Sequence, residues 1–437
     1  MSGNTGESII TLSSYPRAIA HIDCDAFFAS CEQAQQPYLK GRPLVTGKER
    51  GIISSASYEA KACGIKRGVR LSEARRICPK LVVVPSDYET YSLYSRRMFE
   101  IIKRFTPAVE EFSIDEAFCD ITGLRRIYRS SYPAILRMIK DAIHRELNIT
   151  VSAGLSLTKA LAKICSKRDK PDGFTVLPGY LLHEFLRSVP LDAVCGFGPN
   201  TVELLSKLGL TSALDYIRRP LAFASRHLGK AGAELWRELR GESVYPVTAG
   251  KREKHLSISK TKTFMPPSGQ EEIVKAQLMK NVESACIKLR RHKLSAAVLT
   301  VYLKRADFSG SALQAKLSRH TSSTLDFSPL AGRLFASLFA EGVSYRATGA
   351  VLSDVLPEGH DNRTLFDDPV KIKELRELSR SIDAVNGKHG KHTLHLAASH
   401  HAMNGRDHPR NNPSRRKKEL LRGETFRRRV NIPLLRF

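Results

Sequence analysis

The sequence predicts a multidomain α+β protein, because short apolar strands alternate with helical patterns along its first 178 residues. A mostly helical stretch follows, and strand-like runs return after about residue 255. The chain has 437 residues, enough for about two to four domains of roughly 100–200 residues each.

The expected strands of the first part are short apolar runs bounded by polar or turn residues. They lie at 17–23, 43–47, 51–57, 81–85 and 149–156. The helical patterns GYLLHEFLRSV and TVELLSKLG then occupy much of 179–243. We expect a loose arm at 1–16 and a polar linker at 244–254.

The second part is predicted to be a separate α+β domain at 255–356. Its strand-like runs SAAVLTVYLK and ATGAVLSDVL flank the helical pattern EEIVKAQLMKNVESACIKL. From 357 to 437 the composition becomes basic and poor in core residues, which predicts a tail.

Composition restricts the class of partner. The formal net charge is +26, which indicates a polyanion, either nucleic acid or an anionic membrane surface. No apolar run approaches the roughly 18 residues of a membrane span, and the first residues lack the features of a signal peptide. These observations favour nucleic acid, no membrane partner and a cytoplasmic location. The eight scattered cysteines include no C-x-x-C pair, which argues against a zinc site or a disulfide framework.

The stretch HIDCDAFFASCE, residues 21–32, places two carboxylates at the end of an apolar strand. Such a carboxylate is unfavourable unless a positive group pairs with it. Asp25 can be explained as the N-cap of the helical run that follows. Asp23 has no such explanation.

A second acidic cluster lies in EEFSIDEAFCDITG, residues 110–123, where 109–121 is expected to form two strands or a bent hairpin. Asp115 and Glu116 are neighbours, and they can face one site only at a strand end, turn or bulge. A solvated turn is the alternative. Three carboxylates that converge in a basic protein favour a divalent metal site, and oxygen ligands suit Mg²⁺.

Basic side chains provide candidate phosphate ligands. SASYEAKACGIKRG begins a helix at a serine, closes it with Gly64, and places Tyr58 and Lys61 on one face. SLTKALAKICSKRDKP spaces Lys159, Lys163 and Lys167 four residues apart, which predicts one basic stripe near a helix N-terminus. A solvated helix face is the alternative.

LDAVCGFGPNTVELLSKLGL, residues 191–210, carries Gly196 and Gly198 between two helical patterns. This predicts a helix–hairpin–helix, whose glycines let backbone N–H groups approach a DNA phosphate without reading bases. An ordinary helix–helix turn is the alternative.

Together these motifs resemble those of a Y-family translesion DNA polymerase, from about Arg17 to Asp368. HIDCDAFFASCE, SYEAKACGIKRG, SIDEAFCDITG, LTKALAKICSKRDKP and VCGFG carry the resemblance. SYEA is similar to the DNA polymerase IV type, whereas NRTLFDD and IDAVNGKHGKHTLHLA are similar to the catalytic subunit of DNA polymerase V, so the subgroup stays open.

The resemblance implies a right-hand polymerase with four domains. A ferredoxin-like palm would occupy 17–26 and 87–170, with small fingers at 27–86 between them. A helical thumb would occupy 171–243, and an α+β little finger 255–356.

The resemblance also implies the site. Asp23, Asp115, Glu116 and the backbone carbonyl of Cys24 would hold two Mg²⁺, with Glu116 beside the ion that activates the primer hydroxyl and Asp25 structural. Phe28 would be the steric gate against ribonucleotides, whereas Phe27 would pack in the core. The remaining dNTP-binding residues would be Ser55, Tyr58, Lys61 and Lys163. Where this chain has Lys61, many polymerase IV-type sequences have arginine, and lysine lacks its bidentate fork.

The implied function is template-directed DNA synthesis on primer-template DNA, error-prone and poorly processive, as part of the SOS response to DNA damage. Leu365 and Phe366 in NRTLFDD would bind a sliding clamp. The alternative is a loop with two incidental hydrophobic residues. A regulatory subunit is a further expected partner. The histidines between His389 and His401 are expected to lie in a solvated segment. Alternative functions are a non-catalytic DNA-binding accessory of the same family, a palm-type nucleotide cyclase and a metal nuclease.

Overall fold

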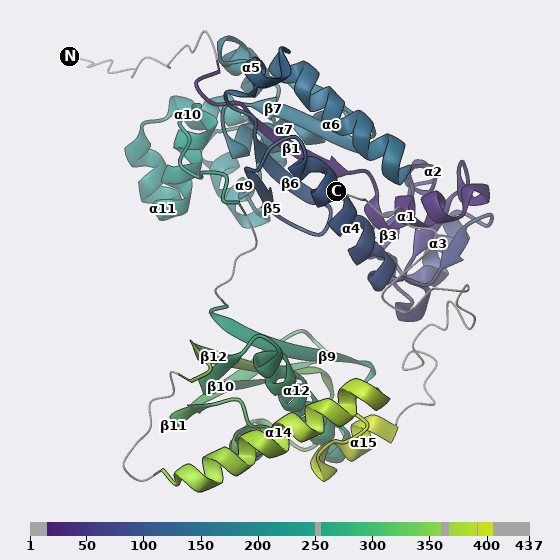
Figure 1. Ribbon diagram of the computed structural model, residues 1–437, viewed down its shortest axis with the longest axis vertical. Helices are drawn as coiled ribbons and strands as arrows, with labels where there is room; N and C mark the ends of the chain where they lie inside the picture. The colour runs from purple at the N-terminus through teal and green to yellow at the C-terminus, as the bar shows by residue number, and fades with distance from the viewer. Residues whose placement is uncertain (1–14, 250–254, 360–366, 391, 405–437) are drawn as a thin grey trace. The chain divides into compact units, whose positions relative to one another are not determined.

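The computed structural model describes residues 15–249, 255–359, 367–390 and 392–404 (Figure 1). The chain folds into two compact units, one within residues 1–251 and the other within 252–412. Residues 244–249 contain no helix or strand. Most of the arm expected at 1–16 lies outside the described residues.

The centre of the first unit is a five-stranded sheet of order β5-β6-β1-β7-β8. Its strands are β5 (Val109–Glu111), β6 (Glu116–Asp120), β1 (Ile19–Cys24), β7 (Val151–Ser156) and β8 (Phe174–Val176). The central strand β1 runs antiparallel to both β6 and β7. The hairpin predicted at 109–121 is confirmed, since β5 and β6 pair antiparallel.

Helices cover both faces of this sheet, so β1 is buried along its whole length. Helices α4 (Tyr88–Lys103) and α6 (Tyr132–Leu147) pack on the face that carries Ala20 and Ile22. Helix α7 (Lys159–Arg168) packs on the opposite face, which carries His21. The approach is close at Gly154, because a Cβ there would lie 2.3 Å from the carbonyl oxygen of Ala162. The short helix α5 (Leu124–Tyr128) precedes α6.

A smaller layer is formed by residues between β1 and α4. Its three-stranded sheet has the order β3-β2-β4. The elements are α1 (Phe27–Gln35), η1 (Pro37–Leu39), β2 (Leu44–Thr46), η2 (Lys48–Arg50), β3 (Ser55–Ala56), α2 (Tyr58–Ala62), α3 (Leu71–Ile77) and β4 (Val82–Val84). A separate small core, which includes Val45, Ile53 and Leu81, holds the three strands and helices α2 and α3 together.

The rest of the first unit is helical, as the sequence predicts. The elements are η3 (Gly179–Leu181), α8 (Leu182–Arg187), η4 (Leu191–Ala193), α9 (Pro199–Lys207), α10 (Ala213–Arg218) and α11 (Leu221–Leu239). Helix α11 kinks at Gly229, whose φ is 64°. Their apolar side chains form a third core around Tyr216 and Trp236.

The second unit contains a four-stranded antiparallel sheet of order β11-β10-β12-β9. The strands are β9 (Ser257–Ser268), β10 (Leu294–Arg305), β11 (Gly310–Thr321) and β12 (Tyr345–Pro357). Helices α12 (Glu271–Arg291) and α13 (Thr324–Leu338) pack on the sheet and enclose a core that includes Phe327 and Phe335.

The tail predicted after 357 is folded where the structure describes it, and the histidine-rich segment that was expected to be solvated packs against another helix. Helix α14 (Pro369–His389) begins at Asp368, whose carboxylate accepts hydrogen bonds from two backbone N–H groups. The histidine-rich segment, with η5 (Ala397–Ser399) and α15 (His400–Asn404), docks on α12. Buried Glu283 accepts hydrogen bonds from the backbone N–H of Leu396 and the hydroxyl of Ser399.

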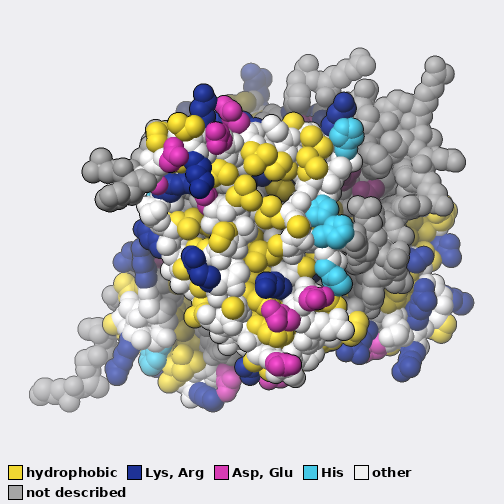
Figure 2. Space-filling view, turned by 90° about the horizontal axis from the view of Figure 1, so that it is seen from below, with side chains coloured by type: hydrophobic (Ala, Val, Ile, Leu, Met, Phe, Trp, Pro, Cys, Tyr) yellow, Lys and Arg dark blue, Asp and Glu magenta, His cyan; other side chains and the backbone are white. Residues whose placement is uncertain are grey.

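Residues 367–390 and 392–404 form a C-terminal extension, whose exposed side chains are of mixed type. Figure 2, which views the molecule from below, shows hydrophobic side chains and histidines interspersed with charged ones. Val370 and Leu378 of α14 are among the exposed apolar residues. The extension therefore has a packed side and an exposed side, a distinction that its composition does not reveal.

Candidate active site

The three carboxylates predicted to converge lie at one end of the β1–β6 pair. Asp23 stands opposite Glu116 in the register of the two strands. Asp115 lies in the turn before β6, where its carbonyl oxygen accepts a hydrogen bond of 2.9 Å from the backbone N–H of Cys24. Because Asp115 lies in this bend and not in the regular strand, it and Glu116 need not point to opposite faces. The structure therefore brings together Asp23, Cys24, Asp115 and Glu116.

Asp23 is paired with a lysine that sequence analysis did not single out. The Nζ atom of Lys170 lies 2.5 Å from Oδ1 of Asp23 and 3.5 Å from Oδ1 of Asp25. Burial raises the pKa of Asp23; Lys170 opposes this shift, whereas the negative charges of Glu116 and Asp115 add to it. Asp23 is therefore a buried acidic group with one ammonium partner and two acidic neighbours.

Glu116 is held from two sides. Nζ of Lys163 lies 2.5 Å from its Oε2 atom, and Nε2 of His21 lies 3.2 Å from the same oxygen. Burial alone would raise the pKa of Glu116, but the hydrogen bonds from His21 and Lys163 outweigh it and lower the pKa to about 2. Glu116 is thus an anion at neutral pH.

His21 takes part in this site as a neutral imidazole, because burial lowers its pKa to about 4. A carboxylate can only accept, so Nε2–H donates to Glu116. Nδ1 lies 2.6 Å from the hydroxyl oxygen of Ser166 on α7, and the same hydroxyl group lies 3.0 Å from the carbonyl oxygen of Lys163. This chain of hydrogen bonds fixes Glu116 relative to the helix that carries Lys163.

Asp115 is half-buried and accepts a hydrogen bond of 2.5 Å from the hydroxyl of Ser113. Each of the three carboxylates therefore has its own polar partner. Within the described residues, no three His, Cys, Asp or Glu side chains are grouped closely enough to hold a metal ion as they stand.

Asp25 is structural, and the interpretation of its side chain as a helix cap is wrong. Helix α1 begins after Ala26, and no side chain caps its N-terminus. The carboxylate of Asp25 is buried and instead accepts hydrogen bonds of 2.8 Å from the hydroxyl of Ser152 and the backbone N–H of Asp172. It ties β1 to β7 and to the chain after α7.

The two adjacent phenylalanines separate as expected. Phe27 is buried in the core. Phe28 is half-buried, and its ring stacks on Tyr91, with centroids 4.5 Å apart and planes at 13°. Tyr88 contacts the ring of Phe28 edge-on at 5.5 Å.

The predicted nucleotide-binding residues of β3 and α2 lie near the chain segment that follows Asp23. The hydroxyl of Ser55 donates to the carbonyl of Ala26 at 3.4 Å, and that of Tyr58 donates to Asp25 at 3.5 Å. Nζ of Lys61 lies 3.9 Å from the centroid of the Tyr58 ring. Helix α2 begins after Ser57, whose hydroxyl accepts from the backbone N–H of Ala60, which confirms the predicted serine start.

The predicted lysine stripe on α7 does not act as one surface. Lys159 is paired with Glu110 at 2.6 Å, Lys163 with Glu116, and Lys167 is exposed. A solvated face is therefore the wrong description of the first two residues. A spacing of four residues is slightly longer than one helical turn of 3.6 residues, so each successive lysine lies further around the helix axis. The row of lysines therefore turns from the sheet toward solvent along the helix.

Sequence analysis missed His21 and Lys170. His21 precedes Asp23 by two residues, so strand alternation places both on one face, and this signal could have identified it. Lys170 follows the end of α7, where no periodicity indicates the direction of its side chain.

The glycine motif at 196–198 forms the turn into α9. Gly196 has a φ of +111°, which a residue with a side chain rarely adopts, and Gly198 caps α9 with no atom within 4 Å of the position of a Cβ. The predicted clamp residues Leu365 and Phe366 lie outside the described residues.

Comparison with known proteins identifies the family. A model of the impB/mucB/samB family matches residues 22–167, and the model of that family's C-terminal domain matches residues 255–365. The chain belongs to the impB/mucB/samB family. The resemblance to Y-family translesion DNA polymerases is thereby confirmed.

Curated relatives and a solved structure agree. The chain is 33% identical over 345 residues to DNA polymerase IV of Streptococcus pyogenes serotype M6, an alignment that covers 78% of this chain and 94% of the relative. It is 32% identical over the same length to that of serotype M4. The Y-family DNA polymerase chimera Dbh-Dpo4(243-245)-Dbh superposes with a TM-score of 0.69 at 24% identity, over 78% of this chain and 100% of the chimera. The predicted right-hand polymerase fold is confirmed.

In the described part of the chain, no helix is both long enough and apolar enough to cross a membrane.

Proposed function

We propose that this protein is a DNA-directed DNA polymerase that adds dNTPs to a primer 3′-hydroxyl and copies damaged templates. The observation that carries the proposal is the position of Asp23, Asp115 and Glu116 at the same end of the β1–β6 pair, on adjacent segments of backbone. The relatives named DNA polymerase IV support the same activity.

We infer the domain roles from the separate cores. The five-stranded sheet would be the palm, the small layer at 27–86 the fingers, 171–243 the thumb and 255–356 the little finger. Fingers of this size would close weakly over a base pair, and weak closure gives weak induced-fit selection. Error-prone, poorly processive synthesis is the expected result.

The donor set of this site fits Mg²⁺, because it consists of carboxylates and a backbone carbonyl, which are hard oxygen ligands. Asp23, Asp115, Glu116 and the carbonyl of Cys24 would hold two ions. The ammonium groups of Lys163 and Lys170 already form ion pairs with Glu116 and Asp23. The pKa of Asp23 is raised mainly by burial, and the negative charges of Glu116 and Asp115 add to this shift. When bound, Mg²⁺ supplies charge stabilisation at the α-phosphate and eases deprotonation of the primer hydroxyl.

The chain's own residues would position the nucleotide. Lys163 would leave Glu116 to contact the triphosphate, together with Tyr58 and Lys61, and Ser55 would support the same region. Phe28 would lie under the sugar, where its ring, supported by Tyr91, leaves no room for a 2′-hydroxyl. In-line phosphoryl transfer depends mainly on this positioning and on charge stabilisation.

The excess of lysine and arginine would bind the phosphates of primer-template DNA. Gly196 and Gly198 in the thumb would donate hydrogen bonds to these phosphates from their backbone N–H groups. We expect the affinity to fall steeply with salt concentration. A sliding clamp that binds Leu365 and Phe366, a regulatory subunit and a cytoplasmic location complete the proposal.

Primer extension by the purified chain, on intact and abasic templates, tests the function. We expect synthesis past the abasic site by the wild type and loss of extension in Asp115→Ala. Asp141→Ala removes a carboxylate of α6 outside the candidate site and is the matched control. Extension that survives Asp115→Ala, or that is absent from the wild type, would contradict the proposal.

A further inference from the structure

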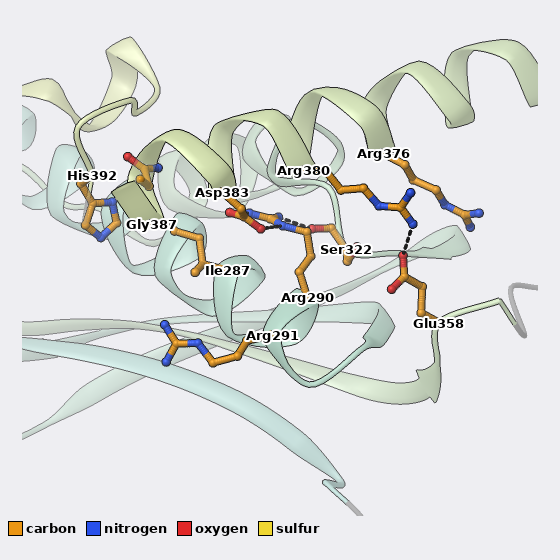
Figure 3. Close-up of a pocket in the computed structure, with 11 residues that line it drawn as sticks. Ile287, Arg290, Arg291, Ser322, Glu358, Arg376, Arg380, Asp383, Gly387 and His392 are labelled. Carbon is orange, nitrogen blue, oxygen red and sulfur yellow. Dashed lines mark hydrogen bonds and ion pairs between the residues drawn. The ribbon is translucent and has the colours of Figure 1, made fainter. Parts of the chain in front are cut away.

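A pocket of about 360 Å³ opens between α12 and α14 of the second unit (Figure 3). Helix α12 contributes Ile287, Arg290 and Arg291, and helix α14 contributes Arg376 and Arg380 among others. The volume falls within the range of roughly 300–1,000 Å³ that is typical of small-molecule sites. All the lining residues belong to the second unit, so the pocket is separate from the candidate active site.

The pocket has an excess of positive charge. Four arginines line it, against two carboxylates, those of Glu358 and Asp383. An anionic ligand is therefore favoured over a cationic or neutral one.

One arginine is fixed and forms the centre of the pocket. Nε and Nη2 of Arg290 donate to the two carboxylate oxygens of Asp383 at 2.7 and 2.8 Å, and Nη1 donates to the carbonyl of Ser322 at 2.7 Å. This bidentate pair joins α12 to α14 and keeps the two walls at a fixed spacing. Since Asp383 compensates the charge of Arg290, a ligand must be bound mainly by the other arginines.

Arg380 is available for that purpose. Its Nη2 atom is 3.7 Å from Oε1 of Glu358, and 72% of its side chain is exposed. An ion pair of this length and exposure stabilises the fold very little, so Arg380 can turn to a ligand. Arg376 lies one helical turn earlier and lines the same pocket, so two guanidinium groups stand on one face of α14 (Figure 3).

The opposite end of the pocket is roomy. Gly387 lines it, and a Cβ at this position would meet no atom within 4 Å. His392 closes this end, with Nε2 3.2 Å from the hydroxyl of Ser284, and Ile287 adds an apolar wall. The pocket thus combines a cationic rim with space for a larger, less polar group.

We propose that this pocket binds a small phosphate-bearing anion, with Arg376 and Arg380 as the phosphate ligands. A phosphate group suits the site better than a single carboxylate, because it carries more negative charge and its oxygens accept hydrogen bonds from planar guanidinium forks. Ile287 and the space beside Gly387 accommodate the organic part of the molecule. The proposal does not depend on the polymerase activity.

Isothermal titration of the full-length chain with inorganic pyrophosphate tests this proposal. The buffer contains EDTA, so that metal-dependent binding at the candidate active site does not contribute. We expect saturable binding by the wild type, and an affinity at least about tenfold lower in the double variant R376A/R380A. The control K371A/K373A removes the same charge from α14 outside the pocket and is expected to change affinity less than about twofold.

A second variant blocks the pocket without changing its charge. Gly387→Leu places a side chain in the open space and improves helix propensity, so we expect a folded protein that binds a nucleoside triphosphate about tenfold more weakly. No binding to the wild type, or equal losses in R376A/R380A and K371A/K373A, would overturn the proposal. A parallel titration with a single-stranded oligonucleotide distinguishes the source of the phosphate. If only oligonucleotide binding depends on Arg376 and Arg380, the assignment to a small molecule is wrong.

Discussion

The ring of Phe28 stacks on the ring of Tyr91, with centroids 4.5 Å apart. The hydroxyl of Tyr91 in turn donates a hydrogen bond to the buried carboxylate of Glu32. Phe28 and Glu32 are four residues apart on α1 and so share a helix face. One face of α1 therefore contacts both the ring and the hydroxyl of a single buried tyrosine, and this fixes the position of the proposed gate residue.

Phe28→Val is expected to admit ribonucleotides, because the smaller side chain leaves space for a 2′-hydroxyl. We expect the discrimination between dNTPs and rNTPs to fall by about tenfold or more. Single-nucleotide kcat/KM for matched dNTP and rNTP pairs measures this. Tyr38→Val, at an exposed aromatic in the same layer, is the control and should leave discrimination unchanged. Unchanged discrimination in Phe28→Val would refute the gate assignment.

Tyr91→Phe keeps the stacking ring but removes the hydrogen bond to Glu32. We expect the free energy of unfolding to fall by about 1–3 kcal/mol, since a buried carboxylate loses a donor. Urea denaturation of wild type, Tyr91→Phe, Glu32→Gln and the double variant forms a thermodynamic cycle. A coupling energy of about 0.5 kcal/mol or more between the two substitutions is expected. Strictly additive effects would show that the hydroxyl and the carboxylate do not interact.

His21 is expected to make the metal-free protein sensitive to acid. Its pKa is lowered from 6.5 to about 4 by burial, so between these values the unfolded chain binds a proton that the folded chain does not. The contribution of His21 to the free energy of unfolding is therefore complete above pH 6.5. It falls as the pH decreases toward 4, by up to about 1.4 kcal/mol per pH unit.

The lowered pKa of Glu116 acts in the same direction at lower pH. Its stabilising contribution is complete above pH 4.5 and is lost as pH falls toward about 2. Chemical denaturation in EDTA across this pH range measures both effects. The variant His21→Gln should lose the slope between pH 4 and 6.5, whereas the ion pair with Lys163 should retain part of the slope at lower pH. Identical pH profiles for the variant and the wild type would disprove the role of His21.

Gly154→Ala is expected to disrupt the contact between β7 and α7. The added Cβ would lie 2.3 Å from the carbonyl oxygen of Ala162 and 2.4 Å from the backbone nitrogen of Ser166, and neither backbone atom can move without displacing α7. We expect a loss of about 1–3 kcal/mol in the free energy of unfolding. Gly198→Ala, where a Cβ meets no atom within 4 Å, is the matched control and should change it by less than about 0.5 kcal/mol. Equal stability of the two variants would show that α7 does not approach β7 this closely.

The sequence by itself determined several elements of the first unit and the identity of the acidic motif. Strand β1, the β5–β6 hairpin and the serine start of α2 were all predicted, because period-2 alternation and turn and capping residues are local signals. The position of Asp23, Asp115 and Glu116 at the same end of the β1–β6 pair could be predicted because each lies at a strand end within an apolar frame.

Only the tertiary structure decided which charged groups meet. Lys170 contacts Asp23 although 147 residues separate them in the sequence, and Lys163 contacts Glu116 across 47 residues. No periodicity in the sequence predicts either contact. The same holds for Asp25, whose N-cap interpretation was plausible locally but is overruled by Ser152, 127 residues away. It also holds for the histidine-rich segment, which docks on α12 because Glu283, buried in another helix, supplies the acceptor that its backbone needs. Periodicity fixes the face on which a side chain lies, whereas its partner is fixed only when distant segments pack together.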